Sequence, residues 1–585
     1  MRSGAYLPLL LVIQAVWLLG PGVVVGVELA RRGIIATYLV VPIAGVVGGL
    51  VGYGALWFYL ISVRAGHAYS YVTILLAAAA VAAIVARPAY RKMLLSVDVA
   101  APLVLLGLLA MFYVAITFSC TVTIGQGTWL NNACHMQGSP GDNALPQIFG
   151  ENILARVPKA TVWDWQTSAR PPLQTGVALM QDPLIHGFGG RLLGYEIVAV
   201  LLQALWVPAL WAVLRALKLS GYRLVAVLTM CAFTGFFIFN SLYVWPKLVA
   251  AAMTLAALVL VFFEKRSWWT WTLAGLAAGA GMLCHSGVAF TLIPMGMLVL
   301  LRRYRPRLRY LALTALGGVV TLLPWELYQK LYDPPGDQLL KYYFAGVWEP
   351  RDGKTTPQPL GHLIVKGYTD PSFTTILHNK WMNVASYLGY PGIDWHIAGG
   401  GGWGQIRAHE WAFLVWGLGL FNLALVMLLV PALRRRLSPA MDLPRLRLMF
   451  AVIGLNLILA AIVYYGPGLA TPAIFQGSYA LMILLFGTLG AILTVLPRRV
   501  VNVLVALNVA YGSVVWVALV WWPHHHHHTS FMGISVLSAA ALLVALWFSA
   551  RRLDAAPPRD QPSDPAGVPG PRAAAREPAQ ARLAG

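Results

Sequence analysis

Acidic residues are scarce in this chain: 21 of its 585 residues are Asp or Glu, against 42 Lys and Arg. Charged residues of both signs make up only 11% of the chain, whereas hydrophobic residues make up 59% and the mean hydropathy is +0.69. So little charge excludes the polar surface of a water-soluble domain. The composition therefore predicts a protein embedded in lipid.

Cysteine is scarce too, with four residues in the whole chain. Cys231 and Cys284 fall in apolar runs, where we expect inert packing residues. Cys120 and Cys134 fall in a hydrophilic loop, where an oxidising compartment would allow a disulfide between them. No spacing rule fixes this pair, so two unrelated thiols remain the alternative.

Long apolar runs recur along almost the whole chain. Each is close to the ~20 residues that a helix needs to cross a ~30 Å hydrocarbon core, and lipid cannot satisfy the backbone groups of any open structure. The sequence predicts an all-α polytopic membrane protein with about fifteen transmembrane helices. We expect spans over residues 5–26, 34–62, 70–86, 99–118, 193–214, 222–240, 246–263, 269–284, 287–301, 309–326, 410–433, 446–466, 477–496, 500–522 and 530–549.

Lys and Arg gather in alternate short loops, for example at Arg31-Arg32, Arg434-Arg435-Arg436 and Arg551-Arg552. The positive-inside rule makes these loops cytoplasmic, which places the N-terminus outside and the C-terminus inside. Two long hydrophilic loops then lie on the outer face. Because the basic residues follow the membrane topology, the net charge of +21 indicates no nucleic-acid partner.

These features divide the chain into consecutive segments. N-terminal helices (1–98) precede a helical module (99–326) that contains the first outer loop (119–192). The second outer loop (327–409) is too long for an idle connection, and its turn signals predict short amphipathic helices on the membrane surface. C-terminal helices (410–549) and a disordered cytoplasmic tail (550–585) follow.

The first outer loop gathers much of the chain's rare charge. Asp142 stands in a turn before an amphipathic stretch, where a carboxylate either caps a helix or performs chemistry. Asp164 lies between Trp163 and Trp165, and is either a second functional carboxylate or part of an interfacial anchor. The charged residues of this loop include Asp142, Glu151, Asp164, Arg170, Asp182 and Arg191.

Two prolines follow Arg170 and restrict the backbone to an extended conformation. An arginine held in this way suits a phosphate or a carboxylate such as Asp142, with a rigid elbow as the alternative. Lys247, His285 and Arg191 stand at outer ends of neighbouring spans. They are either ligands for a phosphate near Asp142 or interfacial anchors.

Further polar residues mark the outer ends of other spans. Gln476, Tyr479 and Trp245 are candidates for binding a sugar, with an aromatic belt as the alternative. Glu196 is an ionisable residue inside an apolar span, a position that commonly faces a cavity and favours a transporter. The run from His524 to His528 could bind a transition metal, but nothing else in the sequence forms a ligand set around it.

Two motifs carry a family resemblance. Gly141-Asp142-Asn-Ala-Leu-Pro, followed by Asp164-Trp-Gln-Thr-Ser-Ala-Arg170-Pro-Pro-Leu, resembles bacterial glycosyltransferases of the GT-C superfamily. The nearer likeness is to family 39-like enzymes, which include protein O-mannosyltransferases and lipid A aminoarabinose transferases. Their catalytic Asp lies early in the first large outer loop, and a His- or Arg-Pro-Pro-Leu precedes the next span.

The resemblance extends over about residues 99–326, including Cys284-His285-Ser-Gly. Two departures stand out: three spans precede the module, and Asn143 stands where many relatives carry an acidic residue. The second departure weakens the case for a carboxylate-bound metal there. A divalent metal ion is therefore left open as a cofactor.

The resemblance implies inverting transfer of a sugar from a polyprenyl-phosphate donor to the hydroxyl of a glycan, lipid or protein acceptor. The reaction would take place at the outer face of a bacterial cytoplasmic membrane. Asp142 would act as the base, and Arg170, Lys247 or His285 would stabilise the departing phosphate. The alternatives are a lipid or polysaccharide transporter, and an oligosaccharide polymerase or ligase with lipid-diphosphate donors.

Overall fold

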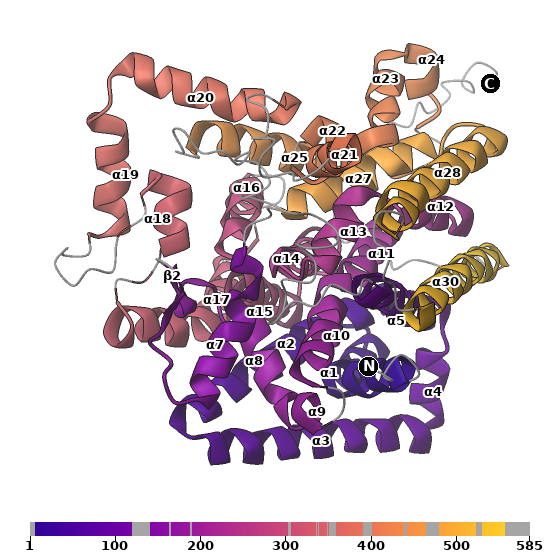
Figure 1. The fold of residues 1–585 in the computed structure, drawn as a ribbon. Coiled ribbons are helices and arrows are strands. Elements are labelled where there is room, and N and C mark those ends of the chain that lie inside the picture. The colour runs from indigo at the N-terminus through magenta and orange to yellow at the C-terminus, as the bar shows by residue number, and fades with distance from the viewer. Residues whose placement is uncertain are drawn as a thin grey trace, which may run out of the picture.

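The computed structural model describes residues 6–119, 141–162, 165–187, 190–301, 306–334, 336, 338–347, 349, 358–389, 401–412, 414–437, 441–463, 479–521 and 529–555. These residues form helices almost throughout (Figure 1). The strands in this part of the chain are β1 (Thr161–Val162) and β2 (Trp165–Gln166), which pair antiparallel in the first outer loop.

The first half of the chain builds the lower part of the bundle in Figure 1. Its helices up to the first loop are α1 (Leu7–Arg31), η2 (Thr37–Leu39), α2 (Val40–Ile61), α3 (Val63–Ala86), α4 (Pro88–Leu94) and α5 (Val97–Ser119). The loop contains η3 (Gly141–Ala144), α7 (Leu145–Leu154), η4 (Thr167–Ala169), α8 (Leu173–Met180) and α9 (Asp182–Gly187). Then follow α10 (Gly190–Ala204), α11 (Trp206–Ala216), α12 (Gly221–Ala232), α13 (Gly235–Leu242), α14 (Lys247–Phe262), α15 (Trp268–Cys284), η5 (Ser286–Val288), α16 (Ala289–Leu300), α17 (Leu308–Leu327) and the π-helix η6 (Tyr328–Tyr332).

The second half begins with three short helices of the second outer loop, α18 (Gln338–Ala345), α19 (Leu360–Thr369) and α20 (Phe373–Leu388). The remaining helices are α21 (Gly401–Ala412), α22 (Leu414–Leu418), η7 (Gly419–Asn422), α23 (Leu423–Leu429), α24 (Pro431–Arg434), α25 (Leu443–Val463), α27 (Tyr479–Leu493), α28 (Arg498–Ser513), the π-helix η8 (Val514–Ala518), α29 (Leu519–Trp521) and α30 (Thr529–Ala555).

Within the described residues, nine helices are long and apolar enough to cross a membrane. They cover Leu7–Arg31, Thr37–Ile61, Val63–Ala86, Val97–Ser119, Leu193–Ala216, Leu308–Tyr332, Leu443–Val463, Arg498–Trp521 and Thr529–Ala555. Two bent helix pairs, Gly221–Ala232 with Gly235–Leu242 and Trp403–Trp411 with Leu414–Leu429, have the same length and apolar character. The chain is therefore an all-α, multi-pass membrane protein, which confirms the predicted class.

The first bent pair falls where the sequence predicts one span, over 222–240, whereas the first helix of the second pair lies mainly in the predicted second outer loop (327–409). The axes of α12 and α13 differ by 59°. Gly235 opens α13, and a Cβ atom there would overlap the Glu410 carboxylate and the Trp516 indole. Trp516 Nε1 donates to Glu410 Oε2 (2.6 Å) and the Tyr511 hydroxyl donates to Oε1. The predicted span over 222–240 is thus bent, and the glycine beside the bend leaves room for a buried carboxylate and its two donors.

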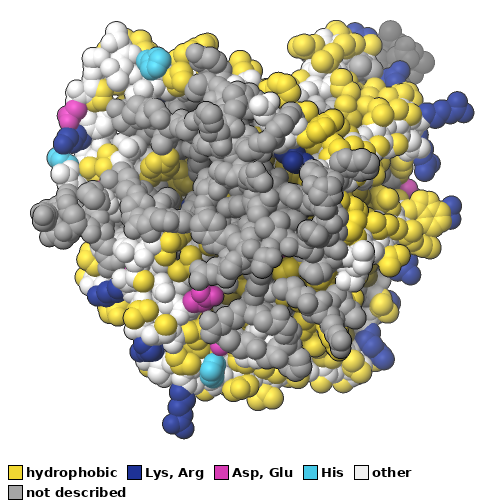
Figure 2. Space-filling view, viewed as in Figure 1, with side chains coloured by type: hydrophobic (Ala, Val, Ile, Leu, Met, Phe, Trp, Pro, Cys, Tyr) yellow, Lys and Arg dark blue, Asp and Glu magenta, His cyan; other side chains and the backbone are white. Residues whose placement is uncertain are grey.

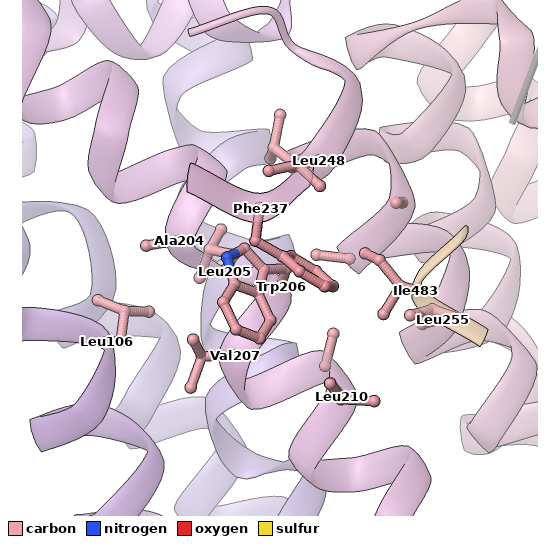
Figure 3. Packing of buried hydrophobic residues seen from close by; sticks show 14 of the residues in the cluster. Leu106, Ala204, Leu205, Trp206, Val207, Leu210, Phe237, Leu248, Leu255 and Ile483 are labelled. Carbon is pink, nitrogen blue, oxygen red and sulfur yellow. The ribbon is translucent and has the colours of Figure 1, made fainter. Parts of the chain in front are cut away.

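Aromatic and branched side chains fill the centre of the bundle. Trp206 of α11 is fully buried, and its ring lies 4.2 Å from that of Phe237 of α13. Figure 3 shows these rings among Leu248 and Leu255 of α14 and Ile483 of α27. Helices α11, α13 and α14 therefore share one core with α27, which comes from a distant part of the sequence. Figure 2 shows hydrophobic side chains on the outer flank formed by α28 and α30 as well.

Short loops that follow alternate helices meet at one end of the bundle. The Tyr38 hydroxyl, after α1, donates to Glu264 Oε1 after α14 (3.0 Å). Lys218, after α11, pairs with Asp442 before α25 (Nζ to Oδ2, 3.3 Å). These contacts join loops that carry basic clusters, whereas residues 141–187 and 333–389 connect the helix ends at the opposite side.

The contact between α1 and α2 yields a stability prediction. A Cβ atom on Gly22 would lie 2.5 Å from the backbone oxygen of Ala44, so Gly22→Ala must push the two helices apart. We expect the unfolding free energy to fall by about 2 kcal/mol. Gly107→Ala in α5 is the matched control, since nothing lies within 4 Å of its added Cβ, and it should gain up to about 1 kcal/mol in helix propensity. Thermal unfolding in one detergent measures both, and equal melting temperatures would contradict the packing argument.

Candidate functional site

The first outer loop returns to the bundle through Arg170-Pro171-Pro172. Arg170 is extended (φ −85°, ψ 132°), as steric repulsion from a following proline favours. Pro172 instead has helical angles (φ −91°, ψ −1°) and caps α8. The predicted extended conformation is therefore confirmed at Arg170 and wrong at Pro172. The arginine side chain is only 4% exposed, although it comes from a loop.

The amide of Gln174 fixes α8 to its neighbours. Its Nε2 donates to the Tyr195 hydroxyl (2.9 Å) and to the backbone oxygen of Val244 (2.9 Å). Its Oε1 accepts from Gln203 Nε2 (2.9 Å), and Gln203 Oε1 accepts from the backbone N–H of Val249 (3.3 Å). All three side chains are buried. The network holds α8 one turn after Arg170. It joins α8 to α10 and to the residues just before and just after the start of α14.

The residues before Arg170 are held by η6 and the residues directly after it. The Ser168 hydroxyl donates to Oδ2 of Asp333, a carboxylate with 0% exposure. Gln166 Nε2 donates to the backbone oxygen of Pro334 (2.8 Å), and Gln329 Nε2 donates to that of Ser168 (2.9 Å). The second outer loop is thus hydrogen-bonded to the first directly before the arginine. We call this contact between Ser168 and Asp333 the clasp.

His285 ends α15 and lies beside Arg170. Its Nδ1 accepts from the backbone N–H of Gly287 (3.1 Å), so the ring is neutral and Nε2 carries the proton. Burial lowers the pKa of His285 well below its ordinary value, and the charges of Lys247 and Arg170 lower it further. Nε2 lies 3.3 Å from the Tyr343 hydroxyl of α18 and 3.4 Å from Arg170 Nη1.

This tautomer decides what the pair can bind. With its proton on Nε2, His285 points an N–H group toward Arg170, and Arg170 Nη1 points an N–H group toward His285. The tyrosine oxygen can accept from the imidazole, but the guanidinium has no acceptor to offer it. Two donors, one of them charged, therefore converge on one place. A phosphate or carboxylate oxygen is the kind of ligand that accepts from both.

Lys247 adds a second basic side chain to the cluster. It begins α14 and is 3% exposed. Its Nζ lies 3.7 Å from the centre of the Trp245 ring and 5.2 Å from that of Tyr479, which are distances of cation–π contacts. The Tyr479 hydroxyl donates to Asn240 Oδ1 (2.7 Å). Trp245 and Tyr479, which are predicted to bind substrate, thus surround Lys247, which is predicted to bind phosphate.

Asp142 lies in η3, and its neighbour Asn143 fixes that turn. Asn143 Nδ2 donates to the backbone oxygen of Tyr243 (3.0 Å), and the Tyr243 ring lies 4.6 Å from that of Trp245. The turn is thereby held beside the segment that leads to Lys247. The side chain of Asp142 lies outside the described residues. The residue at the N-cap of α7 is Ala144, and the helix-capping interpretation of Asp142 stays a prediction.

The other sequence candidates divide into two groups. Glu151 of α7 lines a small cleft together with Asp182 and Tyr195, and Glu196 is buried in α10 beside that tyrosine. Cys231 and Cys284 are buried free thiols, as expected. The remaining candidates lie outside the described residues, either entirely or with their side chains: Cys120, Cys134, Asp164, Arg191, Gln476 and the run from His524 to His528.

Among the residues described, no three His, Cys, Asp or Glu side chains are grouped so that they could hold a metal ion. Two carboxylates of the first outer loop, Asp142 and Asp164, are not part of that search. A divalent metal cofactor therefore stays a prediction.

Several residues of the site carry no sequence signal strong enough to assign them. Gln174 directly follows the Arg-Pro-Pro-Leu motif, and Gln203 is an amide inside an apolar span, which is the one hint that it bonds to another helix. Asp333 and Tyr343 read only as polar residues of the second outer loop. Their partners, Ser168 and His285, lie 165 and 58 residues away, so spacing could not reveal them.

Comparisons with protein-family models, with curated proteins and with solved structures find no match for this chain. What the site can do is therefore argued from its own geometry.

The clasp between the two outer loops can be measured by a double-mutant cycle. Ser168→Ala and Asp333→Ala each remove one partner of a buried hydrogen bond to a carboxylate. We expect a coupling energy of about 1–3 kcal/mol for the pair, measured by unfolding in detergent. Asp370→Ala, which removes a half-exposed carboxylate between α19 and α20, is the control and should show no coupling to Ser168→Ala. Additive effects of Ser168→Ala and Asp333→Ala would contradict the clasp.

The neutral state of His285 predicts a pH dependence of stability. Its pKa in the folded protein is below the unfolded value of about 6.5, so the unfolded chain binds more protons as the pH falls past 6.5. The wild type then loses up to about 1.4 kcal/mol per pH unit from this residue. His285→Asn keeps an acceptor for the Gly287 N–H and does not titrate. Between pH 7 and pH 5 it should lose about 2 kcal/mol less than the wild type.

The control for this pH experiment is His378→Asn, which removes an exposed histidine of α20 and should follow the wild type. If His285→Asn and the wild type lose the same free energy over that range, His285 is not neutral in the folded state.

Proposed function

We propose that the protein is an inverting glycosyltransferase of the GT-C type, which transfers a sugar from a polyprenyl-phosphate donor to an acceptor hydroxyl. The observation that carries the proposal is the convergence of Arg170, His285 and Lys247, buried side chains from three segments, beside the turn that bears Asp142. Together they present the donor groups of a guanidinium, an amine and an imidazole, which is what a departing lipid phosphate requires.

In this mechanism the acceptor hydroxyl attacks the anomeric carbon as Asp142 takes its proton. The bond between that carbon and the phosphate oxygen breaks, and the electron pair leaves with the phosphate. A carboxylate is a weak base toward an alcohol, so proton transfer must accompany attack. Arg170 and Lys247 balance the charge on the leaving phosphate, and His285 donates a hydrogen bond to it from Nε2.

Preorganisation supports this assignment. The Gln174 network holds α8 after Arg170, and the Asp333 clasp holds the backbone before it. An arginine fixed on both sides loses little entropy when the phosphate arrives, and its charge acts in surroundings from which water is largely excluded. The aromatic rings around Lys247 offer a face on which a sugar ring can lie.

The proposal includes the full membrane arrangement, with about fifteen spans in a bacterial cytoplasmic membrane and the site on the outer face. The N-terminus is then outside and the C-terminus cytoplasmic. In support, α14, α27 and the helix over Ser286–Leu300 are shorter apolar helices, and α15 is a further 17-residue helix beside them. The donor lipid would stay in the bilayer, and the acceptor would be a glycan, a lipid or a protein.

One observation favours a second candidate, a lipid or polysaccharide transporter. Transporters often use interrupted helices near a binding site, and two bent pairs are present in the described part of this chain. Glu196, 1% exposed in α10, is an ionisable group of the kind that such proteins use. A polymerase or ligase would bind the diphosphate of its lipid-linked donor with the same basic residues around Arg170.

The first test is transfer by the purified protein in lipid vesicles, supplied with a panel of polyprenyl-phosphate sugars and followed by release of polyprenyl phosphate. Asp142→Asn should lower the rate by about 10²–10⁴. Arg170→Lys keeps the charge but loses the planar pair of donors, and should lower it by about 10². Melting temperatures establish that each variant is folded.

Glu196→Gln is the matched control, because it removes a buried charge without touching the cationic cluster. Under the proposed function it leaves the transfer rate near the wild-type value. If Asp142→Asn transfers sugar at the wild-type rate, Asp142 is not the base. Loss of lipid movement across the vesicle bilayer in Glu196→Gln alone, with no transfer by any variant, establishes the transporter instead.

A further inference from the structure

Helix α20 in the second outer loop exposes one apolar face. Five large apolar side chains on it are 39% to 72% exposed: Phe373, Leu377, Trp381, Val384 and Leu388. Steps of four, four, three and four residues place them in a single stripe along the helix. We call this set the α20 stripe. A contiguous apolar stripe of this length marks an interaction surface.

Side chains on one flank of the stripe hydrogen-bond to a membrane span. Asn383 Nδ2 donates to the backbone oxygen of Ala461 (3.2 Å), and the Tyr387 hydroxyl donates to that of Leu457 (2.7 Å). Both acceptors belong to the last two turns of α25, which ends at Val463. With a rise of 1.5 Å per residue, Leu457 lies only about 9 Å from the end of the span.

This contact sets the depth of α20 relative to a bilayer. A helix of 21 residues, like α25, is about 31 Å long and matches the hydrocarbon core. Its last two turns therefore reach from the end of that core to about 9 Å inside it, and the C-terminal half of α20 is held at that level. The stripe also continues the exposed apolar surface of α25 itself, where Ile458 is 56% and Ile462 is 57% exposed.

The polar groups of α20 agree with this placement. Lys380 Nζ turns toward α19 and donates to the Tyr368 hydroxyl (3.0 Å), which in turn donates to the backbone oxygen of Ile462 (2.8 Å). Partial burial lowers the pKa of Lys380 to about 8. The charged end thus bonds to the protein, and the stripe itself carries no charge.

We propose that α20 is an interfacial helix whose stripe inserts among the lipid acyl chains of the leaflet on the side of the two long loops. The partner is the bilayer, because the stripe lies level with the end of a span and extends its lipid-facing surface. By anchoring the second outer loop, this helix would also hold α18, which brings Tyr343 to His285. The proposal does not depend on the reaction that the site performs.

The test is the depth of spin labels in protein reconstituted into phosphatidylcholine vesicles. Cysteines are introduced at Leu377 and Val384 in the stripe, at His378 beside it, and at Lys366 on α19, whose side chain is 56% exposed. All variants carry Cys120→Ser and Cys134→Ser, and the parent with only the buried native cysteines sets the background. Labels at Leu377 and Val384 should collide several-fold more often with oxygen than with a water-soluble nickel chelate. Labels at His378 and Lys366 should show the reverse.

Two outcomes overturn the proposal. Equal access of nickel to positions 377 and 378 shows that α20 faces water. Protection of position 377 from both oxygen and nickel shows that protein, such as a second copy of the chain, covers the stripe.

A measurement on the unsubstituted protein keeps the proposal testable if a variant fails to fold. Phospholipids with a photoreactive group in the acyl chain should label the peptide 373–388 and leave the peptide 360–369 of α19 largely unlabelled. Labelling of neither peptide, while the spans are labelled, rejects the interfacial helix.

Discussion

A hydrocarbon environment offers no hydrogen bonds, and this constraint shapes both the fold and the site. Backbone groups must be satisfied within helices, and each polar side chain that leaves water must find its partners inside the bundle. The amide of Gln174 meets this requirement with Tyr195, Val244 and Gln203. Because none of these groups can turn to water instead, the network holds the Pro-Pro element in one place against α10 and α14.

The same constraint selects the state of His285. A charged imidazole would be costly in a buried position near Arg170 and Lys247, and its Nδ1 could no longer accept the Gly287 N–H. The neutral tautomer with its proton on Nε2 satisfies both conditions. It leaves a donor pointing toward the guanidinium, so the demands of burial are what give this site its preference for anions.

Sequence reasoning succeeds where a property is local and fails where it depends on distant partners. Apolar run length predicts the membrane class because crossing a bilayer requires about 20 residues. The extended backbone of Arg170 follows from the proline after it. The need for glycine at position 235 does not follow from its neighbours, because Glu410, which a Cβ there would overlap, lies far along the chain. The role of Asp333 was hidden for the same reason, since its partner Ser168 belongs to the other outer loop.

The two outer loops are interlocked, which limits how the site can open. On one side of α18, Asp333 holds Ser168, and on the other side α20 is bonded to the end of α25. Within this stretch, Lys341 forms a buried ion pair with Glu349 (2.5 Å). A rigid swing of α18 that carried Tyr343 away from His285 would have to break the clasp or lift α20 from its span. Access for a ligand is therefore expected to arise from local movement of side chains around Arg170, not from hinged motion of the whole second loop.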